Sequence, residues 1–287
     1  MVSGRGRPSV SCSSLAAAPR IGFGSLTGAM LILLSPAKTM DFSPLPEGLA
    51  TTVPQFEADI AVLLERCREL SVESLRQLMK VSEPLAELNH RRFQEMSLPF
   101  TPQNSKACLF AFQGDVFKRL DAATLSKSDL EWSQDRLRIL SGFYGLLRPM
   151  DLIQPYRLEM GSRLSNRRGK NLYQFWGDRL VDSLNAEHAR RPVAAVLNLA
   201  SNEYIKAVPR QRLEPPMVTA VFQEIRDGQP KTIGFLAKKA RGLMARFVVQ
   251  ERIVDPEELK AFSGEDYRFR PDLSAVDQLV FTRENRG

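Results

Sequence analysis

The sequence contains few of the residues from which metal sites and nucleophilic triads are commonly built. Its three cysteines, Cys12, Cys67 and Cys108, are widely spaced and form no CxxC pair, and its only histidines are His90 and His188. This argues against a disulfide framework and a zinc cluster, and it leaves little material for a multi-histidine metal site or a Ser-His-Asp triad. We therefore predict no cofactor and no resident metal.

Long apolar runs are also absent. The longest, residues 29–34, is far shorter than the roughly 18–20 residues of a membrane-spanning helix. The separated cysteines fit a reducing compartment. Together these features predict a cytoplasmic protein with no membrane partner.

The first 29 residues contain no acidic residue. They hold three arginines and are rich in serine, glycine and alanine, a composition that a transit peptide shares. The alternatives are a disordered extension and a start codon assigned too early, with Met30 as the true start. We favour these alternatives and expect one domain over residues 30–287.

The charge balance alone gives weak guidance to a partner. The 287 residues carry 40 Lys and Arg against 33 Asp and Glu, a formal charge of +7, and 43% of the residues are hydrophobic. That composition is ordinary for a globular protein. Because several of the excess cations lie in the first 29 residues, the placement of the others must decide whether an anion is bound.

Alternating strand and helix patterns predict the fold class. Apolar positions recur at helical spacing over 55–70, followed by two further helices with Ser71 and Ser82 as N-caps. Short apolar runs at 31–34, 107–112 and 194–199 predict buried strands, Ser126 to Asp129 resembles a capping box, and Asp227-Gly228 predicts a hairpin. No internal repeat is present. We expect a single compact α/β domain with a mixed sheet flanked by helices.

Polar side chains follow the first and third predicted strands. Ser35 and Lys38 come after the first, in a loop that lacks the glycines of a P-loop. Ligand groups gather at the carboxyl ends of parallel strands, so these residues are candidates for a phosphate site. The alternative is a tight turn with a solvated lysine.

The segment after the third strand is a candidate small-molecule pocket, formed by Asn198, Ser201, Glu203 and Tyr204. If the first and third strands are neighbours, these side chains face one cleft beside Ser35. Glu203 with Lys206 offers acid–base chemistry if burial shifts their pKa values. Ser201 as an N-cap and Tyr204 in the core would explain the same pattern.

Residues 138–161 combine arginines, tyrosines and glycines more densely than any other segment. Gly142 and Gly145 flank two aromatic residues between two apolar elements, and such a hairpin can offer backbone N–H groups to a phosphate, as in helix-hairpin-helix DNA binders. The spacing of the glycines matches that motif loosely. Alternatively, the glycines allow close packing and the arginines pair with Asp151 and Glu159.

A second cationic segment lies near the C-terminus. Residues 238–246 contain four cations and no acid, at spacings typical of a helix. Within this sequence, this excess of positive charge is the strongest indication of a surface that binds a nucleic-acid phosphate backbone. A solvated helix face would show the same pattern.

The chain resembles the YaaA family of bacterial peroxide-stress proteins. The resemblance is carried by six ordered stretches: MLILLSPAKTMDF at 30–42, FQGDVF at 112–117, LSGFYGLLRPMDLIQPYRLEMG at 140–161, NLYQFWGD at 171–178, NLASNEY at 198–204 and FLAKKARGLMARF at 235–247. It implies an α/β fold of its own, a positively charged cleft, a helix-hairpin-helix-like element, DNA binding, and lowered free iron under hydrogen peroxide.

The DNA- or phosphate-binding residues that we predict are Ser35, Lys38, Arg148, Tyr156, Arg157, Lys170, Lys238, Lys239 and Arg241. The leading hypothesis is a monomeric stress protein that binds DNA by its backbone, independently of sequence, and limits iron-dependent damage. The alternative is an enzyme for a small phosphorylated or nucleotide-like substrate. A third hypothesis is direct iron binding by carboxylates, with Asp115, Asp151, Glu159 and Glu203 as ligands.

Overall fold

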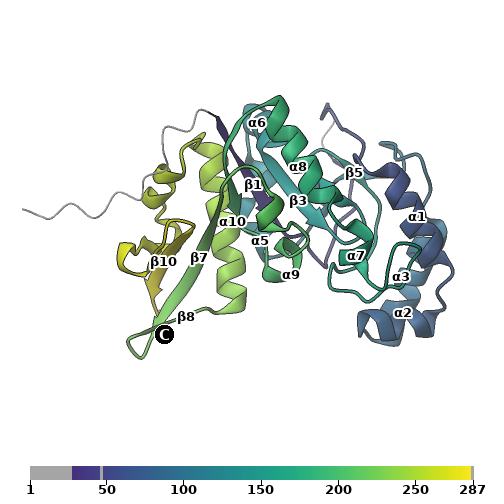
Figure 1. The fold of residues 1–287 in the computed structure, drawn as a ribbon. Helices are drawn as coiled ribbons and strands as arrows, with labels where there is room; N and C mark the ends of the chain where they lie inside the picture. The colour runs from purple at the N-terminus through teal and green to yellow at the C-terminus, as the bar shows by residue number, and fades with distance from the viewer. Residues whose placement is uncertain (1–27, 46–47, 286–287) are drawn as a thin grey trace, which may run out of the picture.

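The computed structural model describes residues 28–45 and 48–285. Most of the predicted N-terminal extension, residues 1–27, lies outside them, and residue 29 already belongs to the first strand. The described residues form a mixed α/β domain, which confirms the predicted fold class (Figure 1).

An 8-stranded mixed sheet runs through the domain in the order β4-β3-β1-β6-β7-β10-β9, with β8 paired to β7. The five strands β3, β1, β6, β7 and β10 are parallel to one another, while β4, β8 and β9 add antiparallel pairs. The separate pair β2-β5 is antiparallel. The strands are β1 (Ala29–Leu34), β2 (Lys106–Ala107), β3 (Leu137–Ser141), β4 (Gly145–Leu147), β5 (Leu152–Ile153), β6 (Val193–Asn198), β7 (Met217–Arg226), β8 (Gln229–Lys231), β9 (Arg268–Phe269) and β10 (Gln278–Glu284).

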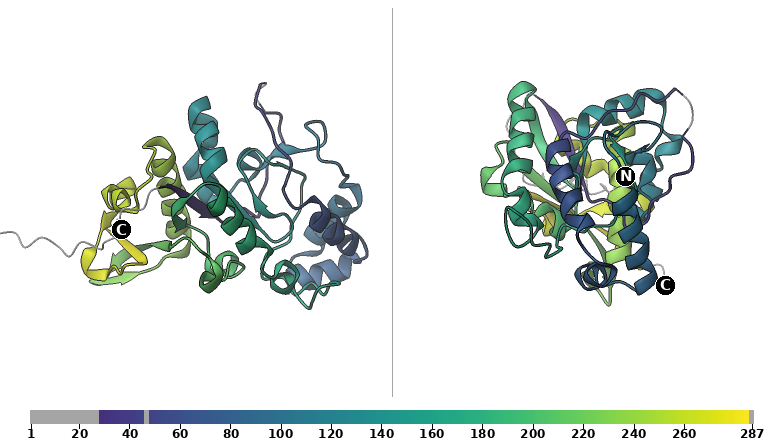
Figure 2. Two further views of the ribbon diagram at one scale, coloured as in Figure 1. Left: turned by 45° about the horizontal axis from the view of Figure 1, so that its top comes forward. Right: turned by 90° about the vertical axis from the view of Figure 1, so that its right-hand side faces the viewer.

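The helices flank this sheet, and α1, α2 and α3 gather at the end opposite β10 (Figures 1 and 2). Their bounds are α1 (Glu57–Arg68), α2 (Val72–Met79), α3 (Glu83–Glu95), α4 (Cys108–Ala111), α5 (Asp115–Leu120), α6 (Lys127–Arg136), α7 (Leu172–Trp176), α8 (Arg179–Arg190), α9 (Asn202–Ile205) and α10 (Gly234–Gln250). The three N-terminal helices and the Ser126–Asp129 capping box occur where the sequence predicts them.

The strand predicted over 107–112 is wrong beyond its first residue. The chain turns into the short helix α4, because the backbone N–H groups of Cys108 and Leu109 donate to the carbonyls of Asp151 and Pro149 rather than to a neighbouring strand. A short buried apolar run fits either state, so periodicity alone could not separate them.

The helix-hairpin-helix-like element is not confirmed at residues 138–161. The elements on both sides of the Gly142 to Gly145 turn are the strands β3 and β4, which pair as a β-hairpin. A close pair of helices does occur elsewhere. Helices α2 and α3 pack together across a short connection in which Lys80 has a φ of 52°.

Helix α10 lies directly against α5 and also packs on β7. The contact with α5 depends on Gly242, where an added Cβ would lie only 2.1 Å from the carbonyl oxygen of Val116. Because the side chain of glycine is a single hydrogen, the backbones of α10 and α5 can approach each other closely. This approach sets the distance between the side chains of α10 and those of α5.

Replacing Gly242 by alanine is expected to lower the free energy of unfolding by about 1–3 kcal/mol, because overpacking forces the two helices apart. Urea denaturation measures the change. The matched control is Gly234→Ala in the same helix, where no atom lies within 4 Å of the new Cβ. The control should be unchanged or stabilised by up to about 1 kcal/mol. Equal effects of the two substitutions would contradict this account of the packing.

Candidate functional site

A pocket of about 260 Å³ lies at the carboxyl ends of the neighbouring strands β1 and β6. Strand β1 is flanked by β3 on one side and β6 on the other, so the sheet connections diverge at this point. Open α/β sheets bind ligands at such switch points. The lining residues are Ser35, Pro36, Ala37, Lys38, Thr39, Gln113, Gly114, Asp115, Val116, Phe117, Tyr156, Arg157, Leu158, Glu159, Leu199, Ser201, Glu203, Tyr204, Lys238 and Arg241.

The loops after β1 and β6 are fastened to each other by two serines. The Ser35 Oγ accepts a hydrogen bond of 2.8 Å from the Ser201 backbone N–H and lies 3.3 Å from the Ser201 Oγ. The two strands are therefore neighbours, which is the condition that the sequence-based hypothesis required. Ser201 does not cap α9 with its side chain.

Asn198 lies outside the pocket lining. It is buried, its Oδ1 accepts from the Ala200 backbone N–H at 3.0 Å, and its Nδ2 lies 3.3 Å from the Thr219 Oγ1. Its contacts hold the turn that leads from β6 to the pocket. Asn198 thus supports the site without lining it.

Two of the pocket's cations share one carboxylate. The Glu159 Oε1 lies 2.9 Å from the Lys38 Nζ and 3.2 Å from the Arg157 Nη2. The side chain of Lys38 is 62% exposed, whereas that of Arg157 is only 17% exposed. Exposed ion pairs are weak, so Lys38 can exchange this carboxylate for a ligand at small cost.

Arg241 is a partly buried cation of the pocket. It lines the pocket from α10, one turn beyond Lys238, and within the described residues it forms no ion pair with a carboxylate. Its Nε is buried and has no hydrogen-bond acceptor. Burial lowers the pKa of Arg241. A buried N–H group without an acceptor is costly, and an anionic ligand that reaches the Nε would remove that cost.

Glu203 and Tyr204 close the side of the pocket formed by α9. The Glu203 Oε1 accepts from the Gly161 backbone N–H at 2.9 Å. Burial, with Tyr156 and Glu203 nearby, raises the pKa of Tyr204 well above its ordinary value. Its phenol therefore stays protonated at neutral pH and can donate a hydrogen bond.

Tyr156 belongs to the pocket floor and is nearly fully buried. Its hydroxyl lies 2.7 Å from the Ser141 Oγ at the end of β3. Burial raises the pKa of Tyr156 as well. This contact anchors the segment that carries Arg157 and Glu159 to the sheet.

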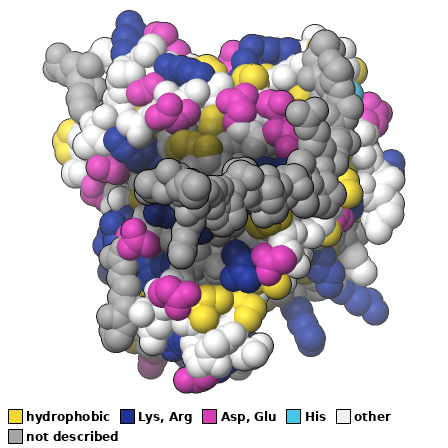
Figure 3. Space-filling model, turned by 90° about the vertical axis from the view of Figure 1, so that its left-hand side faces the viewer, with side chains coloured by type: hydrophobic (Ala, Val, Ile, Leu, Met, Phe, Trp, Pro, Cys, Tyr) yellow, Lys and Arg dark blue, Asp and Glu magenta, His cyan; other side chains and the backbone are white. Residues whose placement is uncertain are grey.

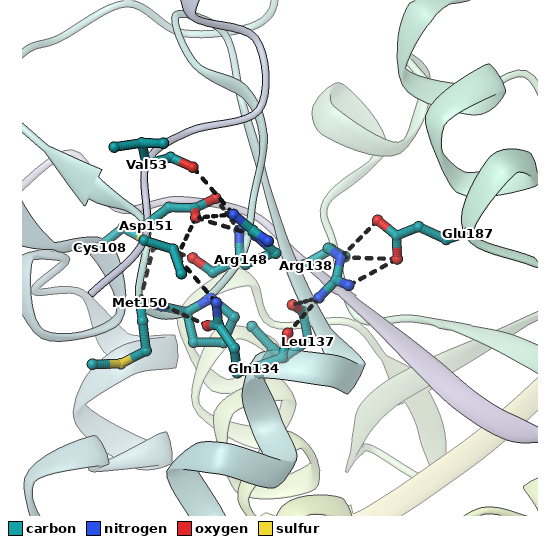
Figure 4. A network of polar contacts seen from close by, with 11 residues as sticks. Val53, Cys108, Gln134, Leu137, Arg138, Arg148, Met150, Asp151 and Glu187 are labelled. Atoms are coloured by element: carbon teal, nitrogen blue, oxygen red, sulfur yellow. Dashed lines mark hydrogen bonds and ion pairs between the residues drawn. The ribbon is translucent and has the colours of Figure 1, made fainter. Parts of the chain in front are cut away.

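Three of the predicted binding residues do not line the pocket: Arg148, Lys170 and Lys239. Arg148 forms a 3.1 Å ion pair with the buried Asp151 and also donates to the Val53 carbonyl (Figure 4). The pairing alternative thus describes Arg148. Lys170 is exposed, and Lys239 lies over the Phe235 ring at 5.4 Å.

The predicted phosphate site left out the loop before α5 and α5 itself, although Asp115 was named as a candidate iron ligand. Gln113, Asp115 and Phe117 all line the pocket. The stretch FQGDVF was recognised as a motif, but because residues 107–112 were predicted as a strand, its position beside the pocket was not predicted. The signal was the glycine and aspartate directly after a buried apolar run.

The described ranges contain no group of three or more His, Cys, Asp or Glu residues placed to hold a metal ion. Of the carboxylates named for iron, Asp115, Glu159 and Glu203 line the pocket, while Asp151 is buried beside Arg148.

In 28–45 and 48–285, no helix has the length and hydropathy to cross a membrane. The face at the β10 end mixes blue cations with magenta acids, so its visible part has no uniform basic field (Figure 3).

Comparisons with known proteins agree on one family. Residues 30–273 match the family model described as peroxide stress protein YaaA. The chain is 51% identical over 259 residues to a UPF0246 protein of Aliivibrio fischeri, covering 90% of this chain and 100% of the relative. UPF0246 proteins of Cellvibrio japonicus and Burkholderia mallei are 48% and 49% identical, over 89% and 88% of this chain and 99% and 98% of theirs. The chain therefore belongs to the YaaA family of peroxide stress proteins.

Proposed function

We propose that the pocket binds a small phosphate-bearing, nucleotide-like ligand. The observation that carries this proposal is the unsatisfied Nε of the partly buried Arg241. Lys38, Arg157 and Lys238 stand around the same cavity, and a phosphate can accept hydrogen bonds from several such donors at once.

The composition of the walls supports a small ligand. The cations Lys38, Arg157, Lys238 and Arg241 are offset by Asp115, Glu159 and Glu203, so the pocket has mixed charge. A ligand with both an anionic group and uncharged polar groups fits this balance better than a bare polyanion. The Tyr204 phenol and the Glu203 carboxylate would lie beside it as a hydrogen-bond donor and a hydrogen-bond acceptor.

DNA binding through backbone phosphates is the second candidate function. It is supported by the exposed Lys238 at the pocket and by the unpaired state of Arg241. The α2–α3 pair is a further candidate contact, because two helices joined by a tight turn can direct backbone N–H groups to a phosphate. The acid Glu83 in the first turn of α3 weakens that contact.

We also propose that the protein acts as a monomer in the cytoplasm.

Removing the Arg241 side chain as Arg241→Ala is expected to weaken binding of AMP and of inorganic pyrophosphate about tenfold or more, since a hydrogen bond to a charged group contributes about 1.5–3 kcal/mol. Isothermal titration calorimetry measures the dissociation constants. Lys239→Ala in the same helix, outside the lining, is the matched control and should bind as the unmodified chain does. Unchanged binding by Arg241→Ala would refute the phosphate site.

For DNA, the double variant Lys238→Glu, Arg241→Glu should bind duplex more weakly and with a smaller salt dependence. Each lost phosphate contact reduces the slope of log affinity against log salt by about 0.9, so a decrease of about two is expected. The control, Lys127→Glu with Arg167→Glu, changes the net charge equally at exposed positions outside the pocket. A slope that is the same in both double variants would exclude this contact.

We also propose that the family's implied role in limiting iron-dependent damage acts through the DNA contact. Duplex bound by the protein should be cut less by ferrous iron and hydrogen peroxide than free duplex, and the Lys238→Glu, Arg241→Glu variant should lose this protection. Gel analysis of strand breaks measures the effect. Equal protection by that variant would separate the role from this surface.

A further inference from the structure

We propose that the pocket receives a single nucleotide that has left the base stack of a DNA strand. The inference rests on the proposed phosphate site and joins it to the second candidate function. A cavity of about 260 Å³ is too small for a duplex. DNA can therefore reach the groups on its floor only by extruding one nucleotide, as proteins that act on a base require.

The walls combine aromatic side chains with polar groups, and a nucleobase needs apolar contact on its faces and hydrogen bonds at its edge. Phe117 and Tyr204 line the cavity and are 5% and 8% exposed. Ser35, Gln113 and Glu203 supply donors and acceptors in the same space. Purely phosphate-binding surfaces have no use for this combination, because a phosphate presents only acceptor oxygens.

Helix α10 carries an exposed aromatic side chain one turn before the pocket-lining Lys238. Phe235 is 54% exposed and is the aromatic member of the exposed large hydrophobic residues that the structure describes. It precedes Lys238 by one helical turn on α10, and the Lys239 Nζ lies 5.4 Å from its ring centroid. Aromatic rings next to cations are the usual platforms for unstacked bases.

Phe235 separates this inference from simple nucleotide binding. It does not line the cavity, so a free nucleotide held inside has no need of it. A DNA strand that inserts one nucleotide leaves a neighbouring base outside the cavity, where Phe235 can stack on it. The phosphates on either side then lie near Lys238 and Arg241. The geometry thus assigns the floor to the extruded base and the first turns of α10 to its flanking strand.

The test compares a fully paired duplex with one that carries a single unpaired 2-aminopurine. The unpaired site should bind about tenfold tighter, because the cost of unstacking is already reduced there. Acrylamide quenching of the 2-aminopurine fluorescence should fall on binding, since the enclosed base loses contact with solvent. Thr39→Trp, which fills the pocket from an exposed lining position, should abolish both effects. Thr124→Trp, exposed and outside the lining, should keep them.

A second variant keeps the result interpretable if the pocket variant is unstable. Phe235→Ala should lower the preference for the unpaired site while AMP binding stays unchanged. Equal affinity for both duplexes with unchanged quenching would overturn the inference and leave the phosphate site standing. Preference and shielding retained by a folded Thr39→Trp protein would also overturn it. If the unmodified chain binds neither AMP, nor pyrophosphate, nor DNA, the proposed function itself is refuted.

Discussion

The parallel pairing of β1 with β6 at the centre of the sheet is the constraint on which the site depends. It places Leu33 opposite Asn198, so the two strands end at the same edge of the sheet. The bond from the Ser201 backbone to the Ser35 Oγ then fixes the two loops to each other. Residues that are far apart in the sequence become two walls of one pocket because these strands are neighbours.

The other walls are brought to this edge by close packing. Gly242 lets α10 approach the backbone of α5, which holds Arg241 and Lys238 across from Asp115 and Phe117. The hydroxyl of Tyr156 ties the segment with Arg157 to the end of β3. The pocket is therefore a product of the whole central sheet, and small shifts in helix packing would change its charge distribution.

Much of this arrangement is predictable from local sequence, and the failures have identifiable causes. Helix caps such as Ser71 and Ser126 were found because capping uses short-range hydrogen bonds. The rule that ligand groups gather at the carboxyl ends of parallel strands supplied the candidate residues, but the pairing of β1 with β6 was only a condition of that hypothesis and comes from the structure. The partner of a long side chain is set by tertiary structure, so whether Arg148 meets Asp151 or a ligand could not be decided from sequence alone. The same limit hid Gln113 and Phe117, whose position depends on the turn into α4.

Arg241, whose Nε has no acceptor within the protein, is the residue proposed to hold the phosphate of a bound nucleotide. The structure of the protein determined with a saturating nucleoside monophosphate tests this role. We expect a phosphate oxygen about 2.7–2.9 Å from an Arg241 nitrogen, as in charge-assisted hydrogen bonds. A nucleotide seated elsewhere, with only solvent beside Arg241, would contradict it.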